Sequence, residues 1–459
     1  MSGGWKIAPN AGPRLSTVLA FSPKVEVGGG RLSTHERRIV RRPSIASPLP
    51  MTATLSASSS PSDTSAAPQS DPLVRHPILL LGDDLGWLAG QRELAGRKIV
   101  LADSGADALT LLASERFEVV LASYKDLNQS LLLLRAAAAT SPAPVALLRA
   151  DGKELAGVSN PYPVLPRVDS VEVLDDQLRT RLAAAAWQAS PDFVALTNRI
   201  TKVPTLPSIY TQVTAALQSP DASIEDIAAL VAREPAVSAK LLQMVNSPLL
   251  GLRGRVTSVR DATNLLGLSR LRSLVLATSL FRQFDGVKCP SFSMSRFEAH
   301  SLQIASWASS IAKSESRDRQ VADMAFTASL LHNFGVLLLA ANLPEQYDQV
   351  LRTAQEQRVS IAWTELQTFG ATHAEIAGAV LASWGIPFPI VNAVGRYPAP
   401  SASDDTEFSP LTALHAATAV DAFTRTGMQN FDRDYLERLQ LGRKMEEWCV
   451  SVPEISDAA

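Results

Sequence analysis

The fold of this chain is decided by three successive segments, LPSIYTQVTAAL (206–217), SIEDIAALVAREPAVSAKLLQMVNSPLLG (223–251) and TSVRDATNLLGLSRLRSLVLATSLF (257–281). Apolar residues recur at helical spacing in each segment, and very few residues remain for loops between them. Helix-start signals fall at regular places within this stretch. Ser223 stands three residues before Asp226, Pro235 suits a first helical turn, and Ser258 precedes VRDATNLLG. The sequence therefore predicts short helices packed as an orthogonal bundle.

The predicted helical domain is long. From Pro191 onward strand signals disappear, and apolar residues keep helical spacing to the end of the chain. We expect an all-α domain over about 195–425, followed by a helical tail over 430–459.

A different pattern precedes the helical domain. Short apolar runs alternate there with helical stretches, which predicts an open, parallel α/β sheet over about 76–186. The predicted strands are HPILLLG (76–82), KIVLA (98–102), FEVVLA (117–122) and APVALLR (143–149), and the predicted helices are ADALTLLASER (106–116) and QSLLLLRAAAAT (129–140).

Composition fits a soluble protein of two or three domains. The chain has 459 residues, of which 46% are hydrophobic and 19% charged, and its formal net charge of −2 argues against a protein that coats nucleic acid. Cys289 and Cys449 are the only cysteines, so no disulfide framework is expected, and a cytoplasmic location is the simpler reading. Residues 1–72 end in a Ser/Pro/Ala-rich run and are predicted to be disordered, with Met51 as an alternative start.

The order and the amino-acid sequences of the segments from 206 to 281 resemble the HDOD domain, as does FGATHAEIAGAVLASWGIP (369–387). That family is similar in fold to the HD metal-dependent phosphohydrolases, and the resemblance implies a signalling module without their metal chemistry. It does not imply which process is regulated.

The resemblance to HD phosphohydrolases also implies where metal ligands would lie. His300 matches the first His of that motif, His332 matches the His of the His-Asp pair, and Asp421 falls near the last Asp. Asn333 stands where the pair has its Asp, so the site loses a carboxylate and an acid–base group. We therefore expect no metal, no cofactor and no turnover. For each helical histidine the competing reading is a hydrogen-bonded core residue; this includes His373, at a predicted helix start.

The α/β region resembles the receiver domain of response regulators, with several departures. Asp83 and Asp84 fit the acidic pair that follows the first strand. The resemblance puts Ser123 at the phospho-acceptor position, Arg149 at the hydroxyl position and Leu165 near the expected Lys. A serine cannot form an acyl phosphate, so phosphorylation by the receiver mechanism is not expected.

Two other readings remain open in the α/β region. The acidic pair can equally be a solvated loop that caps the next helix. Asp126, three residues beyond the strand end, is an alternative acceptor.

Nucleic-acid binding has two candidate elements. IEDIAALVAREPAVSAKLLQMVN (224–246) resembles a helix-turn-helix, but its second helix offers only Lys240 beside large apolar side chains. An Arg-rich stretch is a candidate interaction patch, with a solvated surface as the alternative. Its members are Arg253, Arg255, Arg260, Arg270 and Arg272.

The function expected from the sequence is non-catalytic signal transduction through protein partners, with neither nucleic acid nor membrane involved. The alternative is a metal-dependent phosphohydrolase acting on a nucleotide or cyclic dinucleotide, and Asn333 separates the two. A nucleic-acid-binding regulator is the third possibility. The sequence sets neither the partner nor the oligomeric state.

Overall fold

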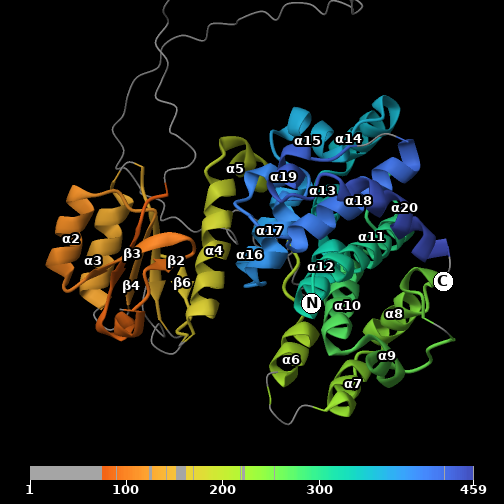
Figure 1. Cartoon of the computed structure of the whole chain (residues 1–459), viewed down its shortest axis with the longest axis horizontal. Coiled ribbons are helices and arrows are strands. Elements are labelled where there is room, and N and C mark those ends of the chain that lie inside the picture. The colour runs from red at the N-terminus through yellow and green to blue at the C-terminus, as the bar shows by residue number, and fades with distance from the viewer. Residues whose placement is uncertain are drawn as a thin grey trace, which may run out of the picture.

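The computed structural model describes residues 75–88, 90–123, 127–140, 142–150, 162–168, 170–217, 219, 223–252, 254–427 and 430–457. It consists of an α/β unit and a helical bundle, with the long helix α4 (Val171–Gln188) lying between them (Figure 1). The segment 1–72, for which disorder was predicted, lies outside the described residues.

The α/β unit is built on a six-stranded sheet with the order β2-β3-β1-β4-β5-β6. All neighbouring strands pair in parallel except β2, which forms an antiparallel hairpin with β3. Without this hairpin strand, the order is second, first, third, fourth, fifth, which is the flavodoxin-like arrangement. The strands are β1 (Ile78–Leu81), β2 (Glu93–Leu94), β3 (Arg97–Ala102), β4 (Val119–Ser123), β5 (Val145–Arg149) and β6 (Val164–Leu165).

Helices cover both faces of this sheet. Successive strand side chains point to opposite faces, so the apolar run of β1 serves two cores. Leu79 packs with α2 (Gly105–Ser114) and α3 (Leu127–Ala138), whereas Leu80 packs with α4. The four principal strands and both helices predicted from the sequence are confirmed, as is the open, mostly parallel sheet.

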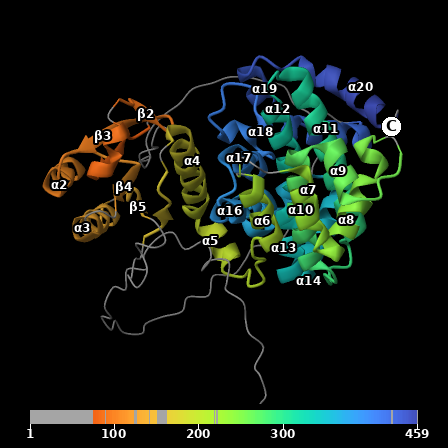
Figure 2. The ribbon, with the colours of Figure 1, turned by 90° about the horizontal axis from the view of Figure 1, so that it is seen from below.

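The helical bundle follows α4 and is also confirmed. Its helices are α5 (Pro191–Thr197), α6 (Ser208–Leu217), α7 (Ile224–Ala232), α8 (Pro235–Val245), α9 (Val259–Leu266), α10 (Leu268–Phe281), α11 (Met294–Glu315), α12 (Arg319–Leu331), α13 (Phe334–Asn342), α14 (Pro344–Gln357), α15 (Ile361–Phe369), α16 (His373–Ser383), α17 (Phe388–Arg396), α18 (Pro410–Thr426), α19 (Arg433–Arg438) and α20 (Lys444–Asp457). Figure 2 shows them gathered on one side of α4 and the sheet on the other.

Local capping explains where several of these helices begin. The hydroxyl of Ser223 accepts the Asp226 amide at the start of α7, and Ser258 caps α9 in the same way. Pro235 occupies the first position of α8, where its missing N–H has no cost. All three predicted helix starts are therefore confirmed.

The most apolar part of the bundle is its centre. The stretch Arg319–Asn342 is long and apolar enough to cross a membrane by length and composition, yet 78% of its most apolar window is buried inside the protein. It is broken at His332 and Asn333, between α12 and α13. These features are typical of core helices.

The predicted carboxyl-terminal tail packs on the bundle as α19 and α20. Tyr435 is fully buried, and its hydroxyl lies 2.8 Å from the Thr412 hydroxyl of α18. The Trp448 indole donates to Glu315 of α11 at 3.2 Å. The tail therefore covers α11 and α18, the two helices that hold His300 and Asp421.

Candidate functional site

The structure brings the four HD-type positions together. His300 lies on α11, Asp421 on α18, and His332 and Asn333 form the break between α12 and α13. His300 Nε2 lies 3.2 Å from Asp421 Oδ2, Asn333 Nδ2 lies 3.2 Å from His300 Nδ1, and the His300 and His332 rings are 5.5 Å apart between centroids. The side chain of His300 is 31% exposed, so it forms the open side of the group.

Hydrogen bonds occupy both ring nitrogens of His300. The Asn333 amide nitrogen can only donate, so His300 Nδ1 accepts and the ring proton lies on Nε2, which donates to Asp421. Asp421 also pairs with Arg425 at 2.5 Å. Burial alone would raise the pKa of Asp421, but the His300 and Arg425 contacts together lower it below its usual value. Asp421 is therefore held as a carboxylate.

His332 is held by a backbone carbonyl and by an aromatic ring. Its Nδ1 donates to the Ser329 carbonyl at 2.5 Å, and its ring packs edge-on against Tyr397. Burial, with a smaller contribution from His300, lowers the pKa of His332 well below 6.5. His332 is consequently neutral near pH 7.

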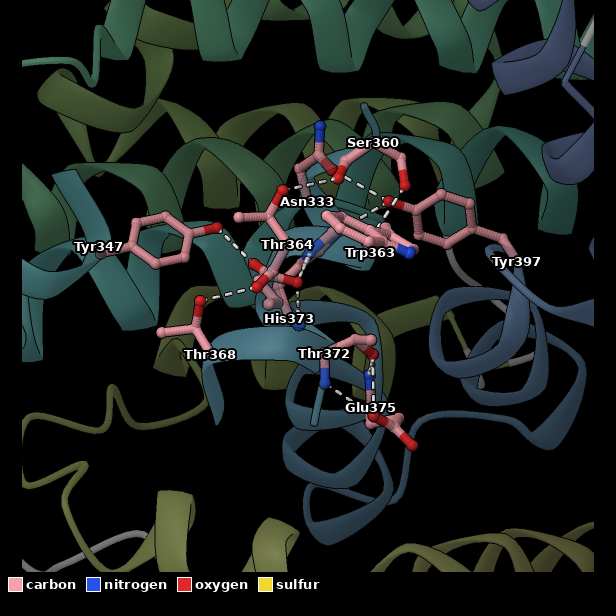
Figure 3. A network of polar contacts seen from close by, with 11 residues as sticks. Asn333, Tyr347, Ser360, Trp363, Thr364, Thr368, Thr372, His373, Glu375 and Tyr397 are labelled. Carbon is pink, nitrogen blue, oxygen red and sulfur yellow. Dashed lines mark hydrogen bonds and ion pairs between the residues drawn. The ribbon is translucent and has the colours of Figure 1, made fainter. Parts of the chain in front are cut away.

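A second set of buried groups continues this site inward (Figure 3). The Tyr397 hydroxyl lies 2.7 Å from His373 Nε2 and 3.3 Å from Asn333 Oδ1. Glu365 accepts from His373 Nδ1 at 2.6 Å and from the Tyr347 hydroxyl at 2.6 Å. A chain of side chains thus runs from the fully buried Glu365 to the half-exposed His300.

The proton of Tyr397 has two acceptors within this chain. His373 Nδ1 donates to Glu365, and the Tyr397 hydroxyl lies within hydrogen-bond distance of both His373 Nε2 and Asn333 Oδ1. Tyr397 therefore links the buried His373–Glu365 pair to Asn333.

His373 is placed by the close approach of two helices. It is the first residue of α16, as predicted, and Thr372 with Glu375 forms a capping box there. A Cβ atom on Gly335 of α13 would lie 1.9 Å from the His373 carbonyl oxygen, so only glycine fits. This contact fixes α13 against the start of α16.

His415 has the character of a core histidine. Its Nδ1 donates to the Tyr397 carbonyl at 2.8 Å, and its Nε2 accepts the Asp432 amide at 2.9 Å. Burial lowers the pKa of His415. The structure therefore supports the hydrogen-bonded core reading for His415.

These residues do not fit a divalent metal as HD phosphohydrolases hold it. A metal requires ring nitrogens and carboxylates with lone pairs directed at one point. Both nitrogens of His300 are used, Asn333 contributes only a neutral amide, and Asp421 is engaged by His300 and Arg425. Within the described ranges, no group of three or more His, Cys, Asp or Glu side chains is arranged to hold a metal ion.

The two neutral histidines predict a pH dependence of stability. Because the folded-state pKa values of His332 and His415 are lowered, the unfolded chain binds protons that the folded chain does not. Stability is fully present above about pH 6.5 and falls as the pH drops below it, by up to about 1.4 kcal/mol per pH unit for each histidine. Urea unfolding at pH 7.5 and 5.5 measures the loss. A His415→Asn variant should show a shallower slope, and an unchanged slope would contradict the assignment.

The receiver-type positions form a row at the carboxyl ends of the strands. Ser123 ends β4, Arg149 ends β5 and Leu165 ends β6, and the three are register partners across the sheet. All three are buried, and Arg149 Nη2 donates to the Val168 carbonyl at 2.8 Å. The edge where a receiver binds phosphate is thus filled by a serine, a guanidinium group and an apolar side chain.

The acidic receiver positions are only partly described. Asp83 and Asp84 begin a 3-10 helix, η1 (Asp83–Leu88), directly after β1, in agreement with their predicted place. Their side chains, and the whole of Asp126, lie outside the described residues.

The members of the Arg-rich stretch differ in their surroundings. Arg255 and Arg260 are exposed, and Arg260 pairs with Glu225 of α7 at 2.7 Å. Arg270 faces the bundle instead, where it donates to Ser309 at 2.8 Å and lies over the Phe326 ring. Arg270 therefore does not share the exposed setting of Arg255 and Arg260. The remaining members are Arg272, which is half-buried, and Arg253, which is outside the described residues.

The helix-turn-helix alternative is not supported by α8. Val237, Leu241 and Val245 on this helix are buried in the bundle core. Lys240, its single cation, pairs with Glu298 at 2.5 Å. One face of the helix is therefore packed in the bundle core, and its exposed face, with Ala236, Ala239 and Gln243, carries no cation for DNA phosphates.

Comparison with known proteins agrees with this fold. Residues 203–400 match the family model of the HDOD domain, a range that includes His300, Asn333 and Tyr397 but ends before Asp421. An uncharacterized protein of Treponema pallidum is 25% identical over 200 residues, or 44% of this chain and 38% of that protein. The match therefore spans less than half the length of this relative.

Solved structures are similar to the chain at low TM-scores. An HDOD domain protein of unknown function from Geobacter sulfurreducens is 22% identical, covers 61% of this chain and 97% of its own, and has a TM-score of 0.47. The MmoQ response regulator of Methylococcus capsulatus is 27% identical, with coverage of 54% and 99% and a TM-score of 0.30. The family match over 203–400 carries the assignment of an HDOD domain.

Sequence reasoning missed three members of the site. Tyr397, Glu365 and Tyr347 lie in no short motif, and they reach the site from α17, α15 and α14. The available signal was Glu365, the one charged residue of its helix, eight residues before His373. Such a residue requires a polar partner.

Proposed function

We propose that this HDOD domain protein is a non-catalytic signal-transduction protein of the cytoplasm that acts through protein contacts. One observation carries the proposal: His300 uses both ring nitrogens in hydrogen bonds to Asn333 and Asp421. A histidine in this state has no lone pair for a metal, and Asn333 supplies no carboxylate. The buried hydrogen bonds that connect these residues to His373 and Glu365 support a structural role for the HD-type positions.

The α/β domain fits the same proposal as a receiver-like module without phosphotransfer. Its strand order is that of the flavodoxin-like folds. Ser123 and Arg149, buried side by side at the strand ends, leave no acceptor carboxylate at that point. We infer that this domain contributes by contacts with the bundle or with protein partners.

A metal-dependent phosphohydrolase is the second candidate, and the convergence of His300, His332 and Asp421 favours it. An HD-type reaction would need a metal to activate water, and the residues at this position are poorly suited to hold one. Neutral His332 and the carboxylate of Asp421 are the groups that such an enzyme would retain.

Hydrolysis assays separate the two candidates. We expect the full chain, supplied with Mn²⁺, Mg²⁺ or Fe²⁺, to hydrolyse cyclic dinucleotides no faster than a His300→Ala/His332→Ala variant. The double variant is the matched background, because it lacks both candidate ligands while keeping the rest of the chain. Turnover that disappears in the double variant would establish the enzyme and refute the proposal.

A further inference from the structure

Helix α4 belongs to both parts of the protein. Leu174 and Leu178, in its first half, are buried in the core of the sheet, whereas Ala184 and Trp187, in its second half, are buried in the core of the bundle. A single 18-residue helix therefore spans both cores (Figures 1 and 2). Because a helix is stiff along its axis, displacement at one end is felt at the other.

Neighbouring carboxylates on α4 reach in opposite directions. Asp175 accepts the backbone amide of Ala95, in the turn between β2 and β3, at 2.5 Å. Asp176 accepts the amide of Phe388, the first residue of α17, at 2.8 Å. The N-cap of α17 is Pro387, which makes no side-chain cap. Asp176 of α4 thus caps α17, and α4 is also the helix that packs against the sheet.

Two guanidinium groups fasten α4 to α17 reciprocally. Arg179 of α4 lies over the Phe388 ring of α17 at 5.9 Å, and Arg396 of α17 lies over the Trp187 ring of α4 at 5.9 Å. The two contacts are eight residues apart on each helix, or about 12 Å at 1.5 Å per residue. They hold the helices together at two points.

Trp187 makes the second of these points rigid. A Cβ atom on Gly395 of α17 would lie 2.2 Å from Trp187 Cζ2, and one on Gly378 of α16 would lie 2.6 Å from its Cη2. The indole therefore rests directly on the backbones of both helices. A shift of α17 relative to α4 cannot occur here without moving the ring.

The end of α17 leads directly into the candidate site. Tyr397 follows Arg396, and its hydroxyl lies between His373 and Asn333 while its carbonyl accepts from His415. Asn333 in turn holds His300. The position of α17 therefore sets the hydrogen bonds of the HD-type residues.

A cavity of about 440 Å³ borders the same seam, between α4, α17 and the loop before α18. Several of its charges are already paired: Arg97 binds Glu118, which also lines the cavity, through two nitrogens, and Asp404 pairs with Arg75. The cavity contains both signs of charge and selects no ligand by charge. The contacts of the seam itself carry the inference.

We propose that α4 and α17 form a clasp that couples the sheet domain to the HD-type residues. The clasp consists of the Asp176–Phe388, Arg179–Phe388, Trp187–Gly395 and Trp187–Arg396 contacts. Movement in the sheet domain that displaces α4 is transmitted through α17 to Tyr397 and from there to Asn333 and His300. Only the biological use of this coupling rests on the proposed function. The coupling itself does not require a partner or an activity.

Hydrogen exchange of the intact chain tests the clasp. Asp176→Ala removes the cap of α17, and we expect exchange to rise about fivefold, the factor that corresponds to a lost helix cap. The rise should appear in α17 and also around Asn333 and His300. Asp176→Asn keeps an acceptor oxygen and should restore most of the protection.

Ser223→Ala is the matched control, because it removes the cap of α7 on the far side of the bundle. This variant should raise exchange in α7 alone. If Asp176→Ala loosens α17 without any change around Asn333 and His300, or leaves α17 itself unchanged, the coupling does not exist. Neither result depends on hydrolysis or partner binding, so the proposed function stands or falls separately.

Discussion

Replacing Glu365 by alanine is expected to lower the free energy of unfolding by about 3–5 kcal/mol. Glu365 is fully buried and accepts three hydrogen bonds, from the Tyr347 hydroxyl, the His373 amide and His373 Nδ1. Without the carboxylate, these donors stay buried with no acceptor, and each lost partner has a desolvation cost. Chemical denaturation of the two proteins measures the difference directly.

Two further variants define the origin of this loss. Glu365→Gln keeps one acceptor oxygen and should recover part of the stability, whereas Gln367→Ala, at an exposed position of the same helix, should change it by less than about 0.5 kcal/mol. A small effect of Glu365→Ala would mean that His373 and Tyr347 do not depend on this carboxylate. The chain that leads to Asn333 would then lack its buried anchor.

The fold was largely predictable because its signals are local. Short continuous apolar runs such as HPILLLG and FEVVLA are typical of strands buried on both faces, and helix starts at Ser223 and Ser258 are fixed by hydrogen bonds within four residues. The short strands β2 and β6 were not predicted. They have two residues each, so no periodicity can be read from them.

Only the part of the candidate site that belongs to the HD-type motif was predictable from the sequence. His300, His332, Asn333 and Asp421 were placed by resemblance, and the structure brings them together. What the sequence does not contain is the direction of each side chain. That direction places Tyr397, at the end of α17, between His373 and Asn333.

The surroundings of each residue in the Arg-rich stretch were not predictable for the same physical reason. Arg260 lies on α9 and is exposed, whereas Arg270 on α10 contacts Ser309 and the Phe326 ring. Arg270 is half-buried, and burial lowers its pKa, with Asp323 acting in the opposite direction. A run of cations on consecutive short helices therefore predicts charge content, but not the burial or partners of each guanidinium group.

The clasp also gives the α/β domain a way to act on the bundle through contact. Its sheet supports one half of α4, and α4 caps and clamps α17. A domain in this position influences the bundle through contact alone. Phosphorylation is not required for such coupling, because any differential contact with two arrangements of α4 is sufficient.

Asn333→Asp is expected to raise the affinity for Mn²⁺ by about 100-fold. The change adds a carboxylate next to Asp421 and His300, and a unit charge about 4 Å from a cation contributes about 4 kcal/mol at an effective dielectric constant of 20. We expect less than this full value because His300 is partly exposed and must give up its present hydrogen bonds. Isothermal titration of Mn²⁺ into the native chain and the variant measures the difference.

The site offers an internal control for this result. Combining Asn333→Asp with Asp421→Asn returns the number of carboxylates to the native value, so the gain in affinity should be lost. Asn342→Asp, which adds the same charge at an exposed contact with Lys202, should leave Mn²⁺ binding unchanged. A gain that survives in the double variant would place the metal elsewhere. No gain in Asn333→Asp would mean that the hydrogen bonds of His300, rather than the missing charge, have closed the site to metals.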